Sequence, residues 1–242
     1  MRIGDLEVGR LGFGAMQLLG PGVWGAPADP ENALRVLRRV VELGIALIDT
    51  SDAYGPEVNE LPIAEALHPY PEGLVIATKG GFTRPGPGRW DPDGRPEHLR
   101  EACDGSLRRL RLERIDVYQL HTPDPAVPLA ESVGTLKELR DEGKIRHVGL
   151  SNVSLAELEE AEQIVPIVSV QNRYNAAEPE GEDVLDACEA RGIPFLPWFP
   201  LGSGSLDPGE ALRFLLARSP VILPIPGTSS VAHLEENVRA VV

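Results

Sequence analysis

Polar side chains that could do proton chemistry follow apolar runs of this 242-residue chain, at the points where the runs end. Asp49, Lys79 and His121 each stand at or just after the end of a run, and Tyr54 lies five residues beyond Asp49. The next two apolar runs end in Ser151-Asn152 and Gln171-Asn172. A carboxylate, an ammonium, a phenol and an imidazole brought together can deliver a proton to an oxygen that gains negative charge. Reduction of a carbonyl group is such a reaction.

Lys79 is the most informative member of this set. An ammonium at the end of a Val-Ile-Ala run is costly unless a carboxylate partners it, and Asp49 on the neighbouring predicted strand is the candidate. Because a nearby cation favours phenolate, we expect Lys79 to lower the pKa of Tyr54 from its reference value of about 10. His121 would hydrogen-bond the same substrate oxygen.

Each of these residues also has an ordinary structural interpretation. Asp49 could cap a turn, His121 could be a hydrogen-bonded core imidazole, and Gln171 could bind a neighbouring carbonyl. A second catalytic interpretation makes Lys79 the Schiff-base nucleophile of a barrel aldolase, but a partner carboxylate would keep its amine protonated. A metal hydrolase is less favoured, since no His-x-His pair or carboxylate–histidine cluster ends a predicted strand, and we expect no metal.

The elements that must position these residues alternate between short apolar runs and amphipathic stretches. A small hairpin is expected over residues 3–8, and strands over 11–17, 46–49, 74–78, 115–120, 145–150, 167–170, 193–196 and 221–225. Helices are expected over 31–44, 59–68, 96–113, 128–143, 155–164, 183–191, 209–218 and 231–241. Ser154 and Glu157 predict a capping box at the start of one of them.

Eight strand–helix pairs in this length predict one (β/α)8 TIM barrel, an α/β fold with eight parallel strands, as a single domain over residues 1–242. The strands are continuous apolar runs, which indicates burial on both faces. In such a barrel all five polar strand ends meet at one rim. An open doubly wound sheet is the alternative. It would want a glycine-rich turn after the first strand, and Gly12-Phe-Gly14 lacks the third glycine.

Composition excludes several other classes of protein. The formal net charge is −14, so binding to nucleic acid or to an anionic membrane surface is not expected. No apolar run approaches the ~20 residues of a membrane span, and no secretory signal is seen, so we expect a cytoplasmic protein. Cys103 and Cys188 lie far apart in helical patterns and are expected to be buried apolar residues.

Six segments in order resemble the aldo-keto reductases along nearly the whole chain. They are Ile48-Asp-Thr-Ser-Asp-Ala-Tyr-Gly55, Thr78-Lys-Gly-Gly81, Asp116-Val-Tyr-Gln-Leu-His121, Gly149-Leu-Ser-Asn152, Val170-Gln-Asn-Arg-Tyr-Asn175, and Ile225-Pro-Gly-Thr-Ser-Ser230 running on to Glu236-Asn237. Met16-Gln-Leu-Leu-Gly-Pro-Gly-Val-Trp-Gly25 and His68-Pro-Tyr-Pro71 are similar to a bacterial subgroup that includes pyridoxal reductase.

The resemblance implies an NADPH-dependent enzyme that reduces an aldehyde or ketone. Tyr54 would be the general acid, with Lys79 and Asp49 lowering its pKa and His121 orienting the carbonyl. The residues implied to bind the cofactor run from the nicotinamide to the adenosine end: Ser151, Asn152, Gln171, Trp198, Leu201, Gly202, Ser203, Thr228, Ser229, Glu236 and Asn237. The loop over residues 80–96, with Phe82, Arg84, Arg89 and Trp90, would form a wall of the substrate pocket.

The chain departs from the family pattern in three places. Gly227 and His233 stand where many relatives place a lysine and an arginine around the 2′-phosphate, which leaves NADH open as the cofactor. Residues 202–210 form a shorter stretch than the family's, and the chain ends at Val242 without the usual C-terminal extension. These two departures motivate an alternative, a nucleotide-sensing regulatory protein of the same fold with impaired catalysis. A small aldehyde, pyridoxal included, is the expected substrate, and a monomer is the expected state.

Overall fold

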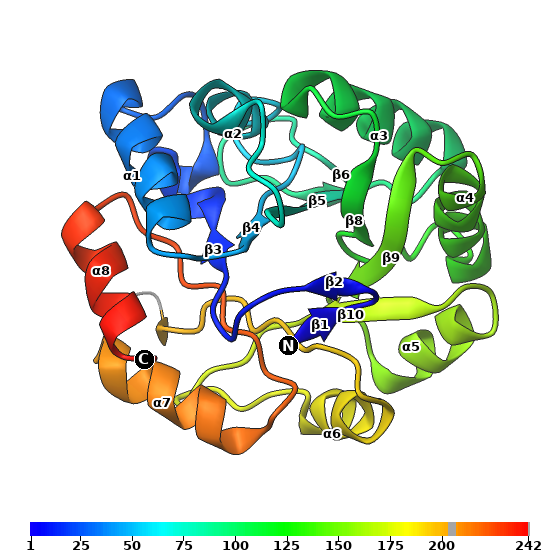
Figure 1. Cartoon of the computed structure of the whole chain (residues 1–242). Coiled ribbons are helices and arrows are strands. Elements are labelled where there is room, and N and C mark those ends of the chain that lie inside the picture. Colours follow the sequence, from blue (N-terminus) through cyan, green and yellow to red (C-terminus); the bar gives the residue numbers. More distant parts are fainter. Residues whose placement is uncertain (203–206, 242) are drawn as a thin grey trace.

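The computed structural model describes residues 1–202 and 207–241. Its largest sheet has six parallel strands in the order β10-β9-β8-β5-β4-β3. The sheet curls, and helices lie around its outer side (Figure 1). In the described part of the chain, no helix has the length and apolar character needed to cross a membrane.

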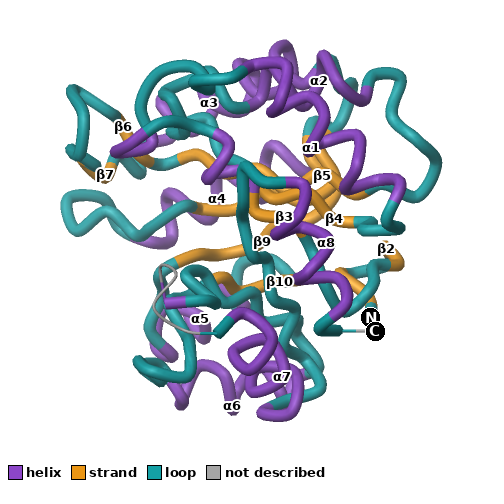
Figure 2. Tube along the Cα trace, turned by 90° about the vertical axis from the view of Figure 1, so that its left-hand side faces the viewer, coloured by secondary structure: helices purple, strands orange, loops and turns teal. Residues whose placement is uncertain are grey.

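The strands of the main sheet follow the predicted apolar runs, with small shifts at their ends. They are β3 (Phe13–Gly14), β4 (Leu47–Asp49), β5 (Val75–Gly80), β8 (Ile115–Leu120), β9 (Ile145–Ser151) and β10 (Ile167–Gln171). Two antiparallel pairs stand apart from it: β1 (Arg2–Ile3) with β2 (Leu6–Glu7), and β6 (Phe82–Thr83) with β7 (Asp91–Pro92). The β6–β7 pair extends beyond one end of the sheet (Figure 2).

The helices match the predicted ones to within a few residues at each end. They are α1 (Pro30–Glu42), α2 (Glu60–Leu67), α3 (Pro96–Leu110), α4 (Leu129–Asp141), α5 (Leu155–Glu162), α6 (Glu182–Arg191), α7 (Pro208–Arg218) and α8 (Val231–Arg239). The capping box at Ser154 and Glu157 is present at the start of α5, as predicted. Asp29 caps α1 in a similar way, since its side chain accepts a hydrogen bond from the backbone of Asn32.

The prediction of eight full strands is wrong for the last two. Segments 193–196 and 221–225 are extended, but each joins its neighbours through isolated parallel bridges, Val170 with Phe195 and Phe195 with Ile222. Prolines at 194, 197 and 224 have no backbone N–H to donate, which interrupts the ladder, although Leu196 still donates to Val170 and Leu223 to Phe195. The backbone N–H of Gly12 donates to the carbonyl of Pro224 (2.9 Å), and this bond joins segment 221–225 to the residues just before β3. The architecture is therefore of the α/β barrel type, with six laddered strands.

The first predicted strand, 11–17, is also shorter than expected. Only Phe13 and Gly14 pair with β4, and the chain then turns into a 3₁₀ segment over Ala15–Leu18. Gly14 is required by close approach, because a Cβ atom there would lie 2.6 Å from the carbonyl oxygen of Ile225. A Cβ atom on Gly227 would in turn overlap the carbonyl oxygen of Gly14. Two glycines thus let the first and last strand segments touch.

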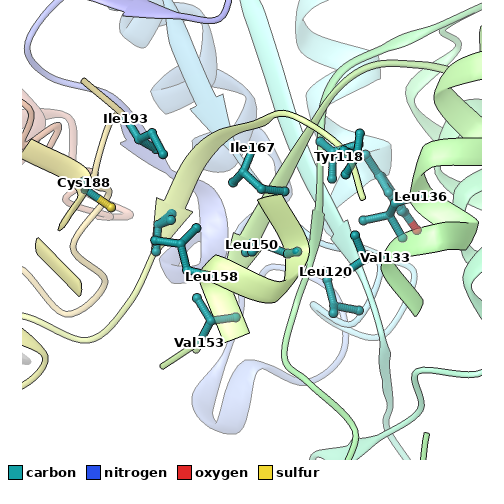
Figure 3. Packing of buried hydrophobic residues seen from close by; sticks show 14 of the residues in the cluster. Tyr118, Leu120, Val133, Leu136, Leu150, Val153, Leu158, Ile167, Cys188 and Ile193 are labelled. Carbon is teal, nitrogen blue, oxygen red and sulfur yellow. The ribbon is translucent and has the colours of Figure 1, made fainter. Parts of the chain in front are cut away.

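The largest apolar cluster fills the space between strands β8 to β10 and the helices outside them. Leu120, Leu150, Leu136 and Leu158 belong to it and are fully buried (Figure 3). Cys103 and Cys188 are free, buried thiols within the same cluster; this matches the apolar role expected of them.

Candidate active site

The polar residues predicted at strand ends lie at one end of the sheet. Asp49, Ser151 and Gln171 are the last residues of β4, β9 and β10, and His121 directly follows β8. Lys79 differs slightly from the prediction, because it lies within β5 and pairs with Gln119 of β8. The parallel register thus places side chains from different strands around one mouth of the curled sheet.

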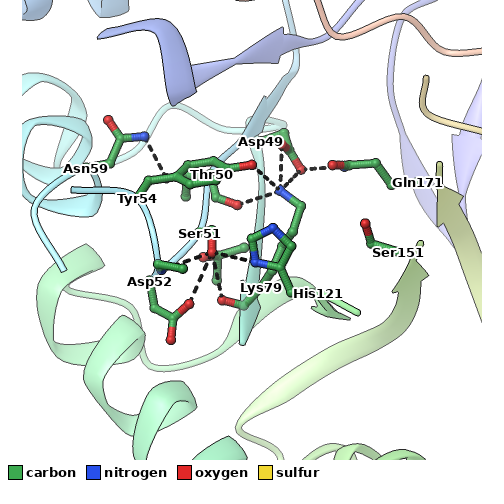
Figure 4. A network of polar contacts seen from close by, with 12 residues as sticks. Asp49, Thr50, Ser51, Asp52, Tyr54, Asn59, Lys79, His121, Ser151 and Gln171 are labelled. Carbon is green, nitrogen blue, oxygen red and sulfur yellow. Dashed lines mark hydrogen bonds and ion pairs between the residues drawn. The ribbon is translucent and has the colours of Figure 1, made fainter. Parts of the chain in front are cut away.

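Lys79 and Asp49 form a buried ion pair on neighbouring strands (Figure 4). The Lys79 amine lies 2.9 and 2.8 Å from the two carboxylate oxygens and also donates to the carbonyl of Thr50 at 2.8 Å. The lysine side chain is fully buried. Burial alone would disfavour its charge, yet attraction to Asp49, together with the hydrogen bonds to Asp49 and Tyr54, outweighs burial and raises the pKa of Lys79. The amine is held protonated, which is the wrong state for the nucleophile of an aldolase.

Tyr54 lies over this ion pair, on the loop that follows β4. Its hydroxyl oxygen is 3.5 Å from the Lys79 amine, and its ring stands edge-to-face against the rings of His121 and Trp90. Backbone hydrogen bonds hold this loop in place. The backbone N–H of Tyr54 donates to the carbonyl of Ser51, and the carbonyl of Tyr54 accepts from the backbone N–H of Asn59. The structure therefore brings Asp49, Tyr54 and Lys79 together.

The expected lowering of the Tyr54 pKa is wrong for this arrangement. Burial raises the pKa of Tyr54, and the attraction of Lys79 opposes that rise only in part. The negative charges of Asp49, the ion-pair partner of Lys79, and of Asp52 both add to the rise. The phenol is therefore neutral around neutral pH, and a neutral phenol has a proton to give.

His121 is buried at the same mouth and is neutral. Burial lowers the pKa of its imidazole well below the usual value, and the cations Lys79 and Arg84 lower it further. Its Nδ1 atom lies 3.0 Å from the hydroxyl oxygen of Ser51, and its ring packs edge-to-face on Phe82. The sequence reading missed Ser51, although it lies only two residues after Asp49.

A cleft of about 1000 Å³ opens over these groups. Twelve of the predicted site residues line it: Asp49, Tyr54, His121, Ser151, Asn152, Gln171, Trp198, Leu201, Thr228, Ser229, Glu236 and Asn237. Lys79 lies beneath the cleft surface rather than on it, and Gly202 is not among its described lining. Ser203, also predicted to bind the cofactor, lies outside the described residues.

The side chains of Asn152 and Trp198 near His121 are joined by hydrogen bonds. Asn152 donates to the carbonyl of His121 (2.9 Å), and its own oxygen accepts from the indole N–H of Trp198 (3.0 Å). Gln171 donates to the Asp49 carboxylate at 2.8 Å, and not to a neighbouring backbone carbonyl. A flat ring with a carboxamide could exchange these contacts for its own, because the donors and acceptors already face the cleft.

Another part of the cleft lining comes from the start of α8. Thr228 and Ser229 precede the helix, and Ser230 caps it by accepting from the backbone of His233. Backbone N–H groups and hydroxyls at a helix start suit the anionic groups of a nucleotide. The described cleft-lining residues include no lysine or arginine, whereas Gly227, His233 and Glu236 are among them.

The predicted substrate wall is present only in part. Phe82 and Trp90 line the cleft. Arg84 lies behind them: its guanidinium stacks on Trp90 at 3.5 Å and donates to the carbonyls of Ala53 and Val23. Arg89 points outward and pairs with Asp91. The two arginines of this loop thus shape the wall and are not on its inner surface.

Several lining residues were not among the predicted site residues, although three of them lie in the Met16–Gly25 motif. Met16, Gln17, Val23 and Thr122 contribute to the cleft from loops around the mouth. Among the described residues, no group of three or more histidine, cysteine or carboxylate side chains could hold a metal ion.

Comparison with known proteins gives a consistent result. The model of the Aldo/keto reductase family matches residues 10–210. An uncharacterized oxidoreductase of Schizosaccharomyces pombe is 49% identical over 257 residues, which cover 99% of this chain and 84% of the relative. The pyridoxine 4-dehydrogenase of Escherichia coli is 42% identical over 261 residues, covering 98% of this chain and 91% of that enzyme.

Solved structures show the same likeness in three dimensions. The holo form of an aldo-keto reductase from Bacillus halodurans superimposes with a TM-score of 0.85 at 30% identity, covering 98% of this chain and 88% of that one. An aldo-keto reductase from Klebsiella pneumoniae in complex with NADPH superimposes with a TM-score of 0.77 at 25% identity, covering 96% and 85%.

Proposed function

The chain belongs to the aldo-keto reductase family, and from that premise we propose that it reduces an aldehyde or ketone to an alcohol with NADPH. The observation that carries the proposal is the buried Lys79–Asp49 pair directly under the hydroxyl of Tyr54. A neutral phenol over a fixed ammonium is an acid whose conjugate base is stabilised as soon as it forms.

Tyr54 acts as the general acid in this proposal. Its hydroxyl donates a proton to the carbonyl oxygen as that oxygen gains negative charge, and the Lys79 ammonium stabilises the phenolate that remains. Asp49 holds the ammonium in place and keeps it protonated. His121, neutral and facing the cleft, orients the carbonyl oxygen by a hydrogen bond.

The cleft suits a nicotinamide dinucleotide by the chemistry of its donors. Ser151, Asn152 and Gln171 offer hydroxyl and amide groups near Trp198, and hydroxyls and a helix start lie at the other part of the cleft. A reduced nicotinamide bound there supplies the hydride. We assign to Trp198 the role of stacking against the nicotinamide ring. We assign to Thr228, Ser229, Glu236 and Asn237 the binding of the adenosine end. The NADPH complex of the Klebsiella pneumoniae relative supports this cofactor.

An uncharged aromatic aldehyde fits the described substrate end of the cleft. Phe82 and Trp90 supply flat apolar surface, and no described lining residue offers an ammonium or guanidinium for a phosphate. The similarity to pyridoxine 4-dehydrogenase points the same way. We therefore propose pyridoxal-like aldehydes without a phosphate group as substrates. Because the site draws on strands β4 to β10 and on α8, we also infer that residues 1–242 act as one domain.

A paired cofactor assay tests the proposal. The full chain is incubated with pyridoxal or an aromatic aldehyde, with NADPH and NADH in parallel, and loss of reduced-cofactor absorbance is followed. We expect turnover with NADPH and slower turnover with pyridoxal 5′-phosphate than with pyridoxal. Tight cofactor binding with no oxidation across a broad carbonyl panel would contradict the proposal and favour the nucleotide sensor.

A further inference from the structure

A three-residue hydrogen-bonded chain leads away from the mouth of the cleft behind His121. The Nδ1 atom of His121 lies 3.0 Å from the Ser51 hydroxyl oxygen, which lies 3.1 Å from a carboxyl oxygen of Asp52 (Figure 4). All three side chains are buried. The other ring nitrogen of His121, Nε2, is on the opposite side of the ring, and His121 lines the cleft. These hydrogen bonds therefore join the buried carboxyl group of Asp52 to the imidazole that would meet the substrate.

From this geometry we infer that Ser51 and Asp52 are positioning residues that set which nitrogen of His121 carries the proton. The catalytic consequence rests on the reductase function proposed above, whereas the tautomer itself does not.

The Ser51 hydroxyl has one proton and three possible acceptors: Nδ1 of His121 at 3.0 Å, the Asp52 carboxyl at 3.1 Å and, at the longer distance of 3.4 Å, the carbonyl of Lys79. The two shorter contacts define its two directions. Its oxygen already accepts a hydrogen bond from the backbone of Ala53 (3.1 Å), so one further acceptor position and one donor remain. If Asp52 is a neutral acid, it donates to Ser51 and Ser51 donates to Nδ1. If Asp52 is a carboxylate, Ser51 donates to Asp52 and accepts from Nδ1–H. Both arrangements satisfy every group of the chain, and they differ in the tautomer of His121.

The two tautomers do different things in the cleft. With Nδ1 accepting from Ser51, the proton of the neutral imidazole is on Nε2, where it can donate to a carbonyl oxygen. With Nδ1 protonated, Nε2 has only a lone pair and cannot donate to that oxygen. In passing from the first state to the second, the Nε2 proton leaves to solvent. The Ser51 proton moves to Nδ1 and the Asp52 proton to Ser51, so one proton is released in all.

The surroundings of Asp52 make both states accessible near neutral pH. Burial raises the pKa of Asp52 to about 7, and the carboxylate of Glu60 on α2 adds to the rise. The Ser51 hydrogen bond and Arg109 on α3 oppose it. Tyr54, on the same loop, and Tyr118 of β8 also interact with Asp52, and both are neutral at this pH because burial raises their pKa.

The charged groups that face His121 keep its imidazole neutral and so do not prevent the change of tautomer. Lys79 on β5 and Arg84 after β6 both disfavour a proton on the imidazole, in addition to its burial. The ring therefore stays neutral near pH 7, and only the place of its single proton changes. The donor tautomer is present below the Asp52 pKa of about 7 and is lost as the pH rises through it.

Nitrogen-15 NMR of the full chain tests the inference without relying on activity. Long-range proton–nitrogen spectra distinguish a protonated ring nitrogen from an unprotonated one, and the His121→Gln variant assigns the signals among the five histidines. In the unaltered chain we expect the protonated nitrogen to change from Nε2 to Nδ1 as the pH rises through about 7. A tautomer that stays the same across that range would overturn the inference.

Two variants sharpen the test. In Asp52→Asn the amide still donates to Ser51 but cannot ionise, so we expect Nε2 to stay protonated at every pH. In Ser51→Ala we expect no pH-dependent change of tautomer. The matched control is Asp116→Asn, which removes another carboxyl of raised pKa; Asp116 accepts from the backbone of Ile76 and lies at the start of β8, whereas His121 follows the end of that strand. It should titrate like the unaltered chain. An Asp52→Asn variant that still switches would overturn the inference.

Kinetics then separate this inference from the proposed function. Above the Asp52 pKa of about 7, kcat/KM for carbonyl reduction should fall by up to about tenfold per pH unit, and Asp52→Asn should abolish that fall. A tautomer switch with no carbonyl reduced would leave the role of Ser51 and Asp52 intact and refute the reductase. Reduction that is independent of pH while the tautomer switches would refute the role of the tautomer in catalysis.

Discussion

The amine nitrogen of Lys79 lies 3.5 Å from the hydroxyl oxygen of Tyr54, at the bottom of the cleft. The lysine is charged and the tyrosine neutral, because burial raises the pKa of the phenol more than the ammonium lowers it. At an effective dielectric of about 20, unit charges about 4 Å apart attract by about 4 kcal/mol. That attraction acts only once the phenol has given up its proton, so it stabilises the product of proton transfer more than the resting site.

Replacing Lys79 with methionine should impair both activity and stability. The change removes the cation beneath Tyr54 and leaves the buried Asp49 carboxylate without its ion-pair partner. Loss of one partner of a buried pair typically costs about 3–5 kcal/mol of folding free energy. Denaturant unfolding measures that loss, and kcat measures the catalytic one.

The control for this prediction is the double variant Lys79→Met with Asp49→Asn, in which no buried charge is left uncompensated. It should recover part of the stability but none of the turnover. If the double variant is as unstable as the single one, the uncompensated Asp49 charge is not the cause.

The reverse reaction gives a signed pH prediction. Oxidation of an alcohol needs Tyr54 as a base, and the raised pKa means that phenolate accumulates only above pH 10. In the Asp52→Asn variant, whose His121 tautomer should not change with pH, the rate of alcohol oxidation should therefore go on rising with pH past 10, whereas a lysine-lowered phenol would give a plateau below pH 10. A pH profile of kcat/KM for the alcohol decides between them, provided that far-ultraviolet circular dichroism shows the chain folded at each pH.

The sequence predicted the positions of the helices and of the polar side chains at the strand ends because both depend on local pattern. Apolar runs marked the ends of β4, β8, β9 and β10, and the parallel arrangement then brought Asp49, His121 and Gln171 to one mouth. The direction of the Tyr54 pKa shift was not predictable in this way. It depends on the balance of burial against one ion pair, and burial of a loop residue is set by the packing of distant segments such as the β6–β7 pair.

Replacing Gly227 with alanine should destabilise the fold. Its Cβ atom would overlap the carbonyl oxygen of Gly14, where the first and last strand segments meet. Forced overpacking of this kind typically costs about 1–3 kcal/mol. The matched control is Gly134→Ala in α4, where an added Cβ atom meets nothing within 4 Å. That change should instead stabilise the helix by about 0.5–1 kcal/mol. Equal effects of the two changes on the melting temperature would contradict the close-approach argument.

Replacing His233 with arginine should increase the preference for NADPH over NADH. His233 is exposed in the first turn of α8 and lines the cleft, whose described lining has no lysine or arginine. An added guanidinium can bind a phosphate in a bidentate manner. We expect the KM for NADPH to fall by about tenfold, equivalent to about 1.4 kcal/mol, with the KM for NADH nearly unchanged. Equal changes for both cofactors would show that position 233 does not contact the 2′-phosphate.

Ser51 and Asp52 could not be predicted as partners of His121 from the polar residues at the strand ends. Both lie in the loop between β4 and α2, and nothing in their spacing indicates a connection to His121, seventy positions away from Ser51. The connection arises because the loop folds back over the mouth, where the Ser51 hydroxyl lies within 3.4 Å of the Lys79 carbonyl. Contacts of this kind depend on tertiary placement.

Removal of the Tyr54 hydroxyl tests the central claim most directly. Tyr54→Phe keeps the ring and its edge-to-face contacts with His121 and Trp90 while deleting the proton donor. We expect the affinity for NADPH, measured by quenching of tryptophan fluorescence, to stay within about twofold while kcat falls by about 10²–10⁴. Turnover unchanged from that of the unaltered chain would show that Tyr54 is not the acid.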